Sequence, residues 1–196
     1  MKILVTGGAG YIGSHVVHAL LGQGISVVVV DDMSAGETSF IEGVPIYKGS
    51  LFSEPEILDT VLSEHPDVDS VIHLAGYKRA GESMQRPLHA YQQNILSTIN
   101  LLRWMKKSGI DNFVFSSSAA VYGTPTVSNV TEQSDTNPES PYGQSKLVCE
   151  WVIKNPDLCA DLEELLNDDF FANLSPGEQN DVMENWMATN KSRVEQ

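Results

Sequence analysis

Three glycines recur at every third position near the start of the chain: Gly7, Gly10 and Gly13. The apolar run ILVT at 3–6 precedes them, and helix-forming residues follow. Glycine lets a backbone turn tightly and approach a pyrophosphate, and the free N–H groups at a helix start bind phosphate oxygens. In this strand-turn-helix context the spacing predicts a dinucleotide-phosphate site, and a plain strand-to-helix turn is the alternative.

Two carboxylates, Asp31 and Asp32, end the apolar run ISVVVV at 25–30. In dinucleotide-binding folds a carboxylate at this place accepts hydrogen bonds from the ribose hydroxyls and repels a 2'-phosphate. No Arg or Lys follows until Lys48. The pair favours NAD over NADP, and a solvated acidic strand end is the alternative.

A second group of residues could carry acid-base chemistry. Tyr142 and Lys146 follow Ser140-Pro141, a good helix start, so both side chains are expected on one helix face. An ammonium beside a phenol stabilises the phenolate, which makes tyrosine a usable base. Ser118 ends the run NFVFSSS at 112–118, at the strand end where sites of parallel sheets form. Taken alone, the pair fits an ordinary exposed contact and the serines fit strand-end hydrogen bonding.

The elements that must position these groups alternate along the chain. Short β-branched runs at 3–6, 25–30, 44–49, 70–76 and 112–118 alternate with helical segments at 14–21, 54–64, 87–108 and 141–154. The runs are apolar throughout, as in strands buried on both faces. We predict an α/β fold, a Rossmann-type parallel sheet with helices on both faces.

Composition narrows the choice of partners. The formal net charge of -14 argues against binding to nucleic acid or an anionic membrane and favours a small-molecule ligand. The start of the chain lacks the long apolar stretch of a secretory signal, and two cysteines without metal-ligand spacing fit a reducing compartment. These features predict a cytoplasmic protein without a metal site.

The character of the sequence changes after Lys154. Residues 155–196 hold ten Asp and Glu against two basic residues and read as two short helices, one starting near Asn155 and one near Ser175. Ser175 and Glu178 form a capping-box pattern. We therefore divide the chain into an NAD-binding Rossmann domain, 1–154, and an acidic helical tail, 155–196. The tail either covers a sheet edge or meets a partner, or it is a solvated helical pair.

Five motifs together resemble the extended short-chain dehydrogenase/reductases, the NAD-dependent epimerase/dehydratase family. They are GGAGYIGSH, the Asp31 strand end, HLAGYKRAGES from His73, SSSAAVYG from Ser116 and SPYGQSK from Ser140. The resemblance covers residues 1–153 and is closest to members that act on UDP-hexoses. It implies NAD-dependent epimerisation at carbon 4 of a UDP-hexose, interconverting UDP-glucose and UDP-galactose through a transient 4-keto sugar.

The resemblance also implies residue roles. Tyr142 is the base, Lys146 binds the nicotinamide ribose and tunes the tyrosine, and Ser118 aids proton handling. The cofactor contacts that it implies are Gly7, Gly10, Tyr11, Ile12, Gly13, Asp31, Asp32, Ser50, Leu51, Leu74, Ala75, Gly76, Lys78, Gln93 and Asn94. A homodimer is a further expectation.

The sequence departs from the family pattern at several points. Ser50-Leu51 stands where the family has an acidic residue near the adenine, and Gln93-Asn94 replaces paired asparagines. After Lys154 we find neither the expected Arg-Tyr-Phe-Asn-Pro-like strand nor the domain that grips the nucleotide sugar. A truncated or rearranged member that binds NAD without efficient turnover is therefore one alternative. Another nucleotide-sugar epimerase or dehydratase is the second, although Ala119 and Ala120 stand where dehydration needs an acidic pair.

Overall fold

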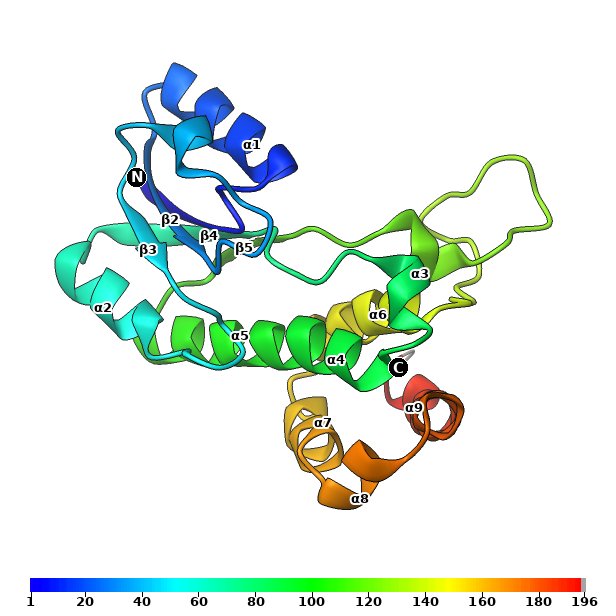
Figure 1. Ribbon diagram of the computed structural model, residues 1–196. Coiled ribbons are helices and arrows are strands. Elements are labelled where there is room, and N and C mark those ends of the chain that lie inside the picture. The colour runs from blue at the N-terminus through cyan, green and yellow to red at the C-terminus, as the bar shows by residue number, and fades with distance from the viewer. Residues whose placement is uncertain (195–196) are drawn as a thin grey trace. The chain divides into compact units, whose positions relative to one another are not determined.

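Five parallel strands form one sheet in the order β3-β2-β1-β4-β5 (Figure 1). The computed structural model describes residues 1–194. The strands are β1 Lys2–Thr6, β2 Ser26–Asp31, β3 Ile46–Lys48, β4 Val68–His73 and β5 Asn112–Phe115. Leu4 of the central strand lies opposite Val28 on one side and Val71 on the other. The predicted Rossmann-type parallel sheet is confirmed.

The chain divides into two compact units. The first consists of Met1–Gly76 and Asn100–Ser116, and it holds the whole sheet. The second consists of Tyr77–Ile99 and the rest of the described chain from Ser117.

In the first unit, helices cover both faces of the sheet (Figure 1). They are α1 Tyr11–Gly22, α2 Ile57–Glu64 and most of α5 Ser97–Ser108, with a short 3-10 turn, η1, at Thr38–Ile41. Side chains that alternate along the strands enter two separate cores. One core joins Leu4, Val28, Val30, Leu58, Val61, Leu101 and Trp104, and the other joins Ile3, Val5, Val17, Val27 and Val29. Burial on both faces explains why these strands are apolar throughout.

The predicted helix at 87–108 is helical along its length but changes its winding. It consists of α4 Pro87–Tyr91, a π-helical turn η2 at Gln92–Leu96, and α5. Such turns are rare and often accompany functional sites. This turn contains Gln93 and Asn94, two of the predicted cofactor contacts.

The second unit is built from helices and loops. Besides α4 and η2 it contains α3 Ala80–Ser83, η3 Ala119–Tyr122, α6 Pro141–Lys154, α7 Leu158–Leu166, α8 Asp169–Asn173 and α9 Pro176–Val194. Helix α6 starts and ends where the sequence predicted it. No helix within residues 1–194 is long and apolar enough to cross a membrane.

Residues 155–194 form three helices, so the prediction of two short ones was wrong. Asp168 accepts a hydrogen bond from the Phe171 N–H at 2.9 Å and thereby starts the extra helix, α8. The predicted capping box is confirmed, because the Ser175 N–H donates to the Glu178 carboxylate at 2.9 Å and the Glu178 N–H donates to Ser175 Oγ at 3.4 Å. The last helix, α9, is long, with 19 residues.

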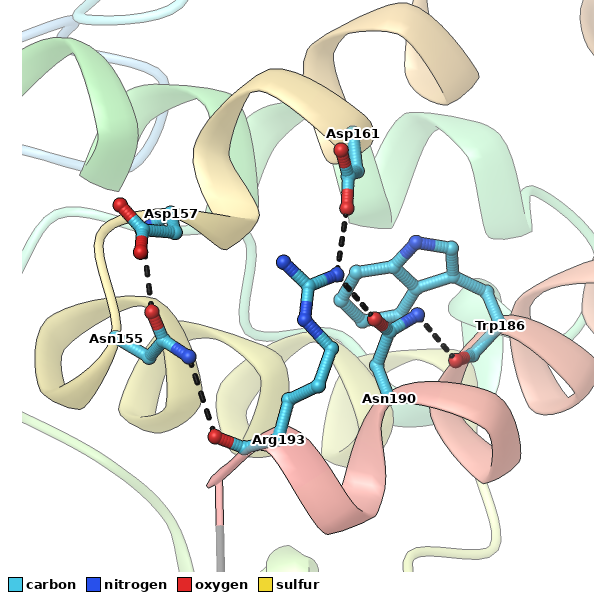
Figure 2. A network of polar contacts seen from close by, with 6 residues as sticks. All are labelled: Asn155, Asp157, Asp161, Trp186, Asn190 and Arg193. Atoms are coloured by element: carbon cyan, nitrogen blue, oxygen red, sulfur yellow. Dashed lines mark hydrogen bonds and ion pairs between the residues drawn. The ribbon is translucent and has the colours of Figure 1, made fainter. Parts of the chain in front are cut away.

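A polar network holds the end of α9 against the end of α6 and the start of α7 (Figure 2). The Asn155 side chain accepts the Asp157 N–H and donates to the Arg193 carbonyl, both at 3.2 Å. The Arg193 guanidinium donates to Asp161 at 2.7 Å and to Asn190 at 2.6 Å. These contacts join Arg193, near the end of the C-terminal segment, to Asn155 and Asp161 near its start. The segment therefore packs within the second unit.

Candidate functional site

The glycine turn joins β1 to α1 in the first unit. Gly7 has a φ of +71°, and its N–H donates to the Val30 carbonyl at 2.8 Å. A Cβ atom at Gly7 would lie 2.6 Å from the backbone nitrogen of Ala75, and one at Gly13 would collide with the Gly7 carbonyl oxygen. The tight turn and its close backbone approaches therefore require glycine at both positions.

The start of α1 offers backbone donors next to this turn. Gly10 precedes the helix and brings no capping side chain, and the Ser14 N–H bonds back to the Gly10 carbonyl at 2.9 Å. The earlier N–H groups of a helix have no acceptor within it, and the helix dipole adds positive potential there. Tyr11 and Ile12 are 72% and 64% exposed. This helix start can receive a phosphate.

Asp31 lies beside the glycine turn, as predicted, but is almost fully buried. One carboxylate oxygen accepts the Ala9 N–H at 3.0 Å, and the other accepts the Met33 N–H at 2.9 Å. Two carboxylate oxygens have about four acceptor sites, so each oxygen can still accept a hydrogen bond from a ribose hydroxyl. Asp32 is exposed and accepts the Ser34 N–H at 2.8 Å.

The segment after β3 places Ser50 and Leu51 in structural roles. Ser50 Oγ accepts the N–H groups of Phe52 and Ser53 at 3.2 and 3.3 Å. The Leu51 side chain lies in the core, and its carbonyl accepts a hydrogen bond from Asn100 at 2.8 Å. Contact between these two residues and a cofactor stays a prediction.

The segment after β4 is held by Thr6 on the neighbouring strand. The Leu74 N–H donates to the Thr6 carbonyl at 3.0 Å, and the Ala75 N–H donates to Thr6 Oγ1 at 3.4 Å. Thr6 Oγ1 also bonds to His73 Nδ1 at 2.6 Å. Leu74 and Ala75 are half-buried, and Gly76 is exposed.

In the second unit, α6 carries the predicted base and its lysine. Ser140 caps the helix by accepting the Gly143 N–H at 3.1 Å. Tyr142 is half-buried and Lys146, one turn further on, is 6% exposed. Burial lowers the pKa of Lys146, because a buried ammonium loses its hydration. The helix therefore presents a phenol and a desolvated amine one turn apart.

Ser118 lies in the same unit and caps η3. Its Oγ accepts the Ala120 N–H at 3.2 Å, which leaves its own O–H free to donate elsewhere. The turn η3 packs on α6, and a Cβ at Gly143 would be 2.7 Å from the Ala120 carbonyl oxygen. Next to it, the Ser117 hydroxyl donates to Glu150 of α6. The unit therefore brings Ser118 to the helix of Tyr142 and Lys146.

Both N–H groups of the Asn94 side-chain amide donate to acceptors within the protein. Its Oδ1 accepts the Tyr77 N–H at 2.7 Å, and its Nδ2 donates to the Tyr77 carbonyl at 3.1 Å and to Ser145 Oγ at 2.8 Å. The residue thereby ties the loop at Tyr77 to α6. Gln93 is half-buried and Lys78 is exposed. A cofactor contact from these three residues stays a prediction.

Comparison with known proteins identifies the family of the chain. A family model described as the NAD dependent epimerase/dehydratase family matches residues 3–157. The chain belongs to this family. One member, a UDP-glucose 4-epimerase of Azospirillum brasilense, is 46% identical over 155 residues, which cover 79% of this chain and 44% of that protein.

Solved structures of UDP-glucose 4-epimerases are also similar to this chain. The chain is similar to a UDP-glucose 4-epimerase from Brucella ovis in complex with NAD, with a TM-score of 0.73 and 34% identity over 83% of this chain and 49% of that one. An epimerase from Bifidobacterium longum in complex with NAD+ and UDP gives a TM-score of 0.73 and 36% identity, covering 82% and 50%. The chain spans about half the length of the relatives that it matches.

Sequence reasoning missed residues that position the predicted site residues. Thr6 orients Ala75, and Ser83 Oγ accepts the Tyr142 N–H at 3.2 Å. Ser145 accepts from Asn94 and donates to the Tyr142 carbonyl at 2.7 Å. A lone Thr or Ser carries no signal in a sequence, and these became visible only through their partners. Among residues 1–194, no cluster of His, Cys, Asp or Glu could hold a metal ion.

Proposed function

We propose that the chain binds NAD at the glycine turn and interconverts UDP-glucose and UDP-galactose by epimerisation at carbon 4. Membership of the epimerase/dehydratase family, together with Tyr142 and buried Lys146 on α6, is the observation that carries the proposal. The relatives described as UDP-glucose 4-epimerases support the choice of substrate.

The residues of the first unit fit a dinucleotide. Gly7 and Gly13 keep Cβ atoms out of the turn, and α1 begins with uncapped N–H groups and no acidic side chain in its first turn. That is the chemistry a pyrophosphate requires. Asp31 would accept the adenosine ribose hydroxyls and, by its charge, disfavour a 2'-phosphate.

The residues of α6 and η3 would move the proton. NAD held at the glycine turn would supply a reversible hydride acceptor for carbon 4, and the 4-keto sugar would turn over before it is reduced on its other face. The Tyr142 oxygen would take the proton of the 4-hydroxyl as carbon 4 is oxidised and give it back as the 4-keto sugar is reduced. The Lys146 ammonium would stabilise the phenolate, and the free O–H of Ser118 would hydrogen-bond the sugar oxygen. The net reaction is an isomerisation that consumes no cofactor.

The remaining predictions from the sequence belong to the same proposal. They are a division of the chain at residues 154 and 155, a UDP-hexose as the small-molecule partner, a cytoplasmic location and a homodimer. NAD binding without efficient turnover is the second candidate, because the family match ends at residue 157.

Turnover of UDP-galactose tests the proposal. The purified chain with NAD should convert UDP-galactose to UDP-glucose, separated by chromatography, while a Tyr142→Phe variant should lose at least about 10²-fold in rate. Tyr47→Phe is the matched control, since Tyr47 lies in β3 and outside the proposed site. A wild-type chain that binds NAD and yields no UDP-glucose would reject epimerisation and leave the second candidate. Formation of a dehydrated 4-keto product would instead indicate a dehydratase.

A further inference from the structure

Gln144 lies on the helix that carries the proposed catalytic pair, between Tyr142 and Lys146. Successive residues of an α-helix are separated by about 100° around the helix axis. Gln144 is two residues from both Tyr142 and Lys146, so it projects from the side of α6 opposite to that pair. Its side chain is 2% exposed. A buried amide must have its donors and acceptor satisfied, and the partners of Gln144 therefore matter for α6.

Both ends of the Gln144 amide are held by other helices. Its Oε1 accepts the Tyr91 hydroxyl of α4 at 2.5 Å, and its Nε2 donates to Glu184 of α9 at 3.1 Å. Tyr91 is fully buried, and burial together with the nearby Glu184 carboxylate raises its pKa, so the phenol stays a donor. The amide is thus fixed between one neutral donor and one charged acceptor.

Glu184 is in turn oriented within α9. The Asn180 Nδ2 donates to the same Glu184 oxygen at 2.8 Å, one helical turn before it. Asn180 Oδ1 also lies 3.2 Å from the Tyr91 hydroxyl, so α4, α6 and α9 share one polar cluster. A second tie joins the far end of α6 to α9, where Asn155 donates to the Arg193 carbonyl at 3.2 Å (Figure 2).

Helix α9 lies beyond the residues that the family model matches, which end at 157. The contact from Gln144 to Glu184 is therefore made by a residue outside the part of the chain that the family model matches. Because the Gln144 Nε2 donates to Glu184, α9 holds α6 from the side opposite Tyr142 and Lys146.

We propose that Glu184 is a positioning residue, which acts through Gln144 to fix α6 and so to set the Tyr142 phenol against Lys146. The inference rests on the proposed function for the catalytic role of that pair. Glu184 touches neither substrate nor cofactor in this account. A small misplacement of a catalytic group can lower the rate on the order of 10²-fold. The contact between Gln144 and Glu184 can therefore affect the rate without touching the substrate.

The test compares three variants of the full chain. Glu184→Ala removes the acceptor, Glu184→Gln keeps an acceptor of the same shape, and Asp181→Ala removes an exposed carboxylate from the same helix as a matched control. We expect Glu184→Ala to lower kcat by about tenfold to a hundredfold with KM changed less than twofold, Glu184→Gln to recover part of the loss, and Asp181→Ala to match wild type.

A readout without turnover separates this inference from the proposed function. In protein labelled with fluorotyrosine, the Tyr142 fluorine resonance is assigned by its loss in Tyr142→Phe. We expect it to shift or broaden in Glu184→Ala at temperatures where the variant is folded, and to be unchanged in Asp181→Ala. An unchanged resonance in folded Glu184→Ala would overturn the positioning role, whether or not the wild type turns over. A shifted resonance in Glu184→Ala, together with a wild type that shows no turnover, would reject only the epimerase function.

Discussion

Replacing Gly7 by alanine tests whether the glycine turn is fixed by its close approach to Ala75. Gly24 serves as the matched control, because it has a φ of +74° but nothing within 4 Å of an added Cβ. A left-handed conformation costs a non-glycine residue about 1–2 kcal/mol, and the reduced freedom of the unfolded chain offsets about 0.4–1 kcal/mol of this. Gly24→Ala should therefore cost roughly 1 kcal/mol.

Gly7→Ala should cost more, because the Ala75 backbone must move away from a Cβ that would lie 2.6 Å from its nitrogen. Overpacking of this kind adds about 1–3 kcal/mol, which gives a total of roughly 2–4 kcal/mol. With a urea dependence of about 1–3 kcal/mol/M, the midpoints of the two variants should differ by roughly 1 M. NAD affinity should fall in Gly7→Ala and stay unchanged in Gly24→Ala.

Equal unfolding free energies for the two variants would show that the turn is not fixed by its approach to Ala75. The contact with Ala75 would then contribute nothing beyond the cost of a positive φ. Unchanged NAD affinity in a folded Gly7→Ala variant would separately remove the turn from the proposed cofactor site.

Three further predictions concern the two thiols, a tyrosine and a helix cap. Burial raises the pKa of Cys149 to about 11, so in the native chain at neutral pH a maleimide should modify half-buried Cys159 and spare Cys149, and both should react in denaturant. Rapid native labelling of both would contradict this. Burial and a hydrogen-bonded glutamate raise the pKa of Tyr47 to about 12 from 10.0. The protonated phenol stabilises the fold below pH 10, and this contribution is lost as pH rises through about 12, so wild type should lose stability relative to Tyr47→Phe in that window. Parallel pH profiles of unfolding would refute it. Ser175→Ala should cost about 1 kcal/mol through loss of the α9 cap, and exposed Ser192→Ala, in the last turn of the same helix, should cost less than half of that.

The sheet and the start of α6 could be predicted from local patterns. Runs such as ISVVVV must be buried on both faces, which requires a parallel sheet with helices on each side. Ser140 and Pro141 provide a cap and a first helical residue, and α6 begins there. These signals lie within a few neighbouring residues, so no knowledge of distant contacts was needed.

Other features depend on partners that are distant along the chain. The π-helical turn at Gln92–Leu96 accompanies the burial of Asn94 against Tyr77 and Ser145, which no helical periodicity reveals. The third helix of the C-terminal segment depends on one side-chain cap at Asp168, which reads as an ordinary acidic residue. Gln144 looks like a solvated position until Tyr91 and Glu184 are seen on either side of its amide.

Calorimetric titration of the chain with NAD and with NADP tests whether the glycine turn and Asp31 form an NAD site. We expect saturable binding of NAD, and binding of NADP that is weaker by at least about tenfold, because the Asp31 carboxylate opposes a 2'-phosphate. Asp31→Asn should narrow that difference. No binding of NAD would exclude an NAD site at the glycine turn, and equal affinity for the two nucleotides would exclude the proposed role of Asp31.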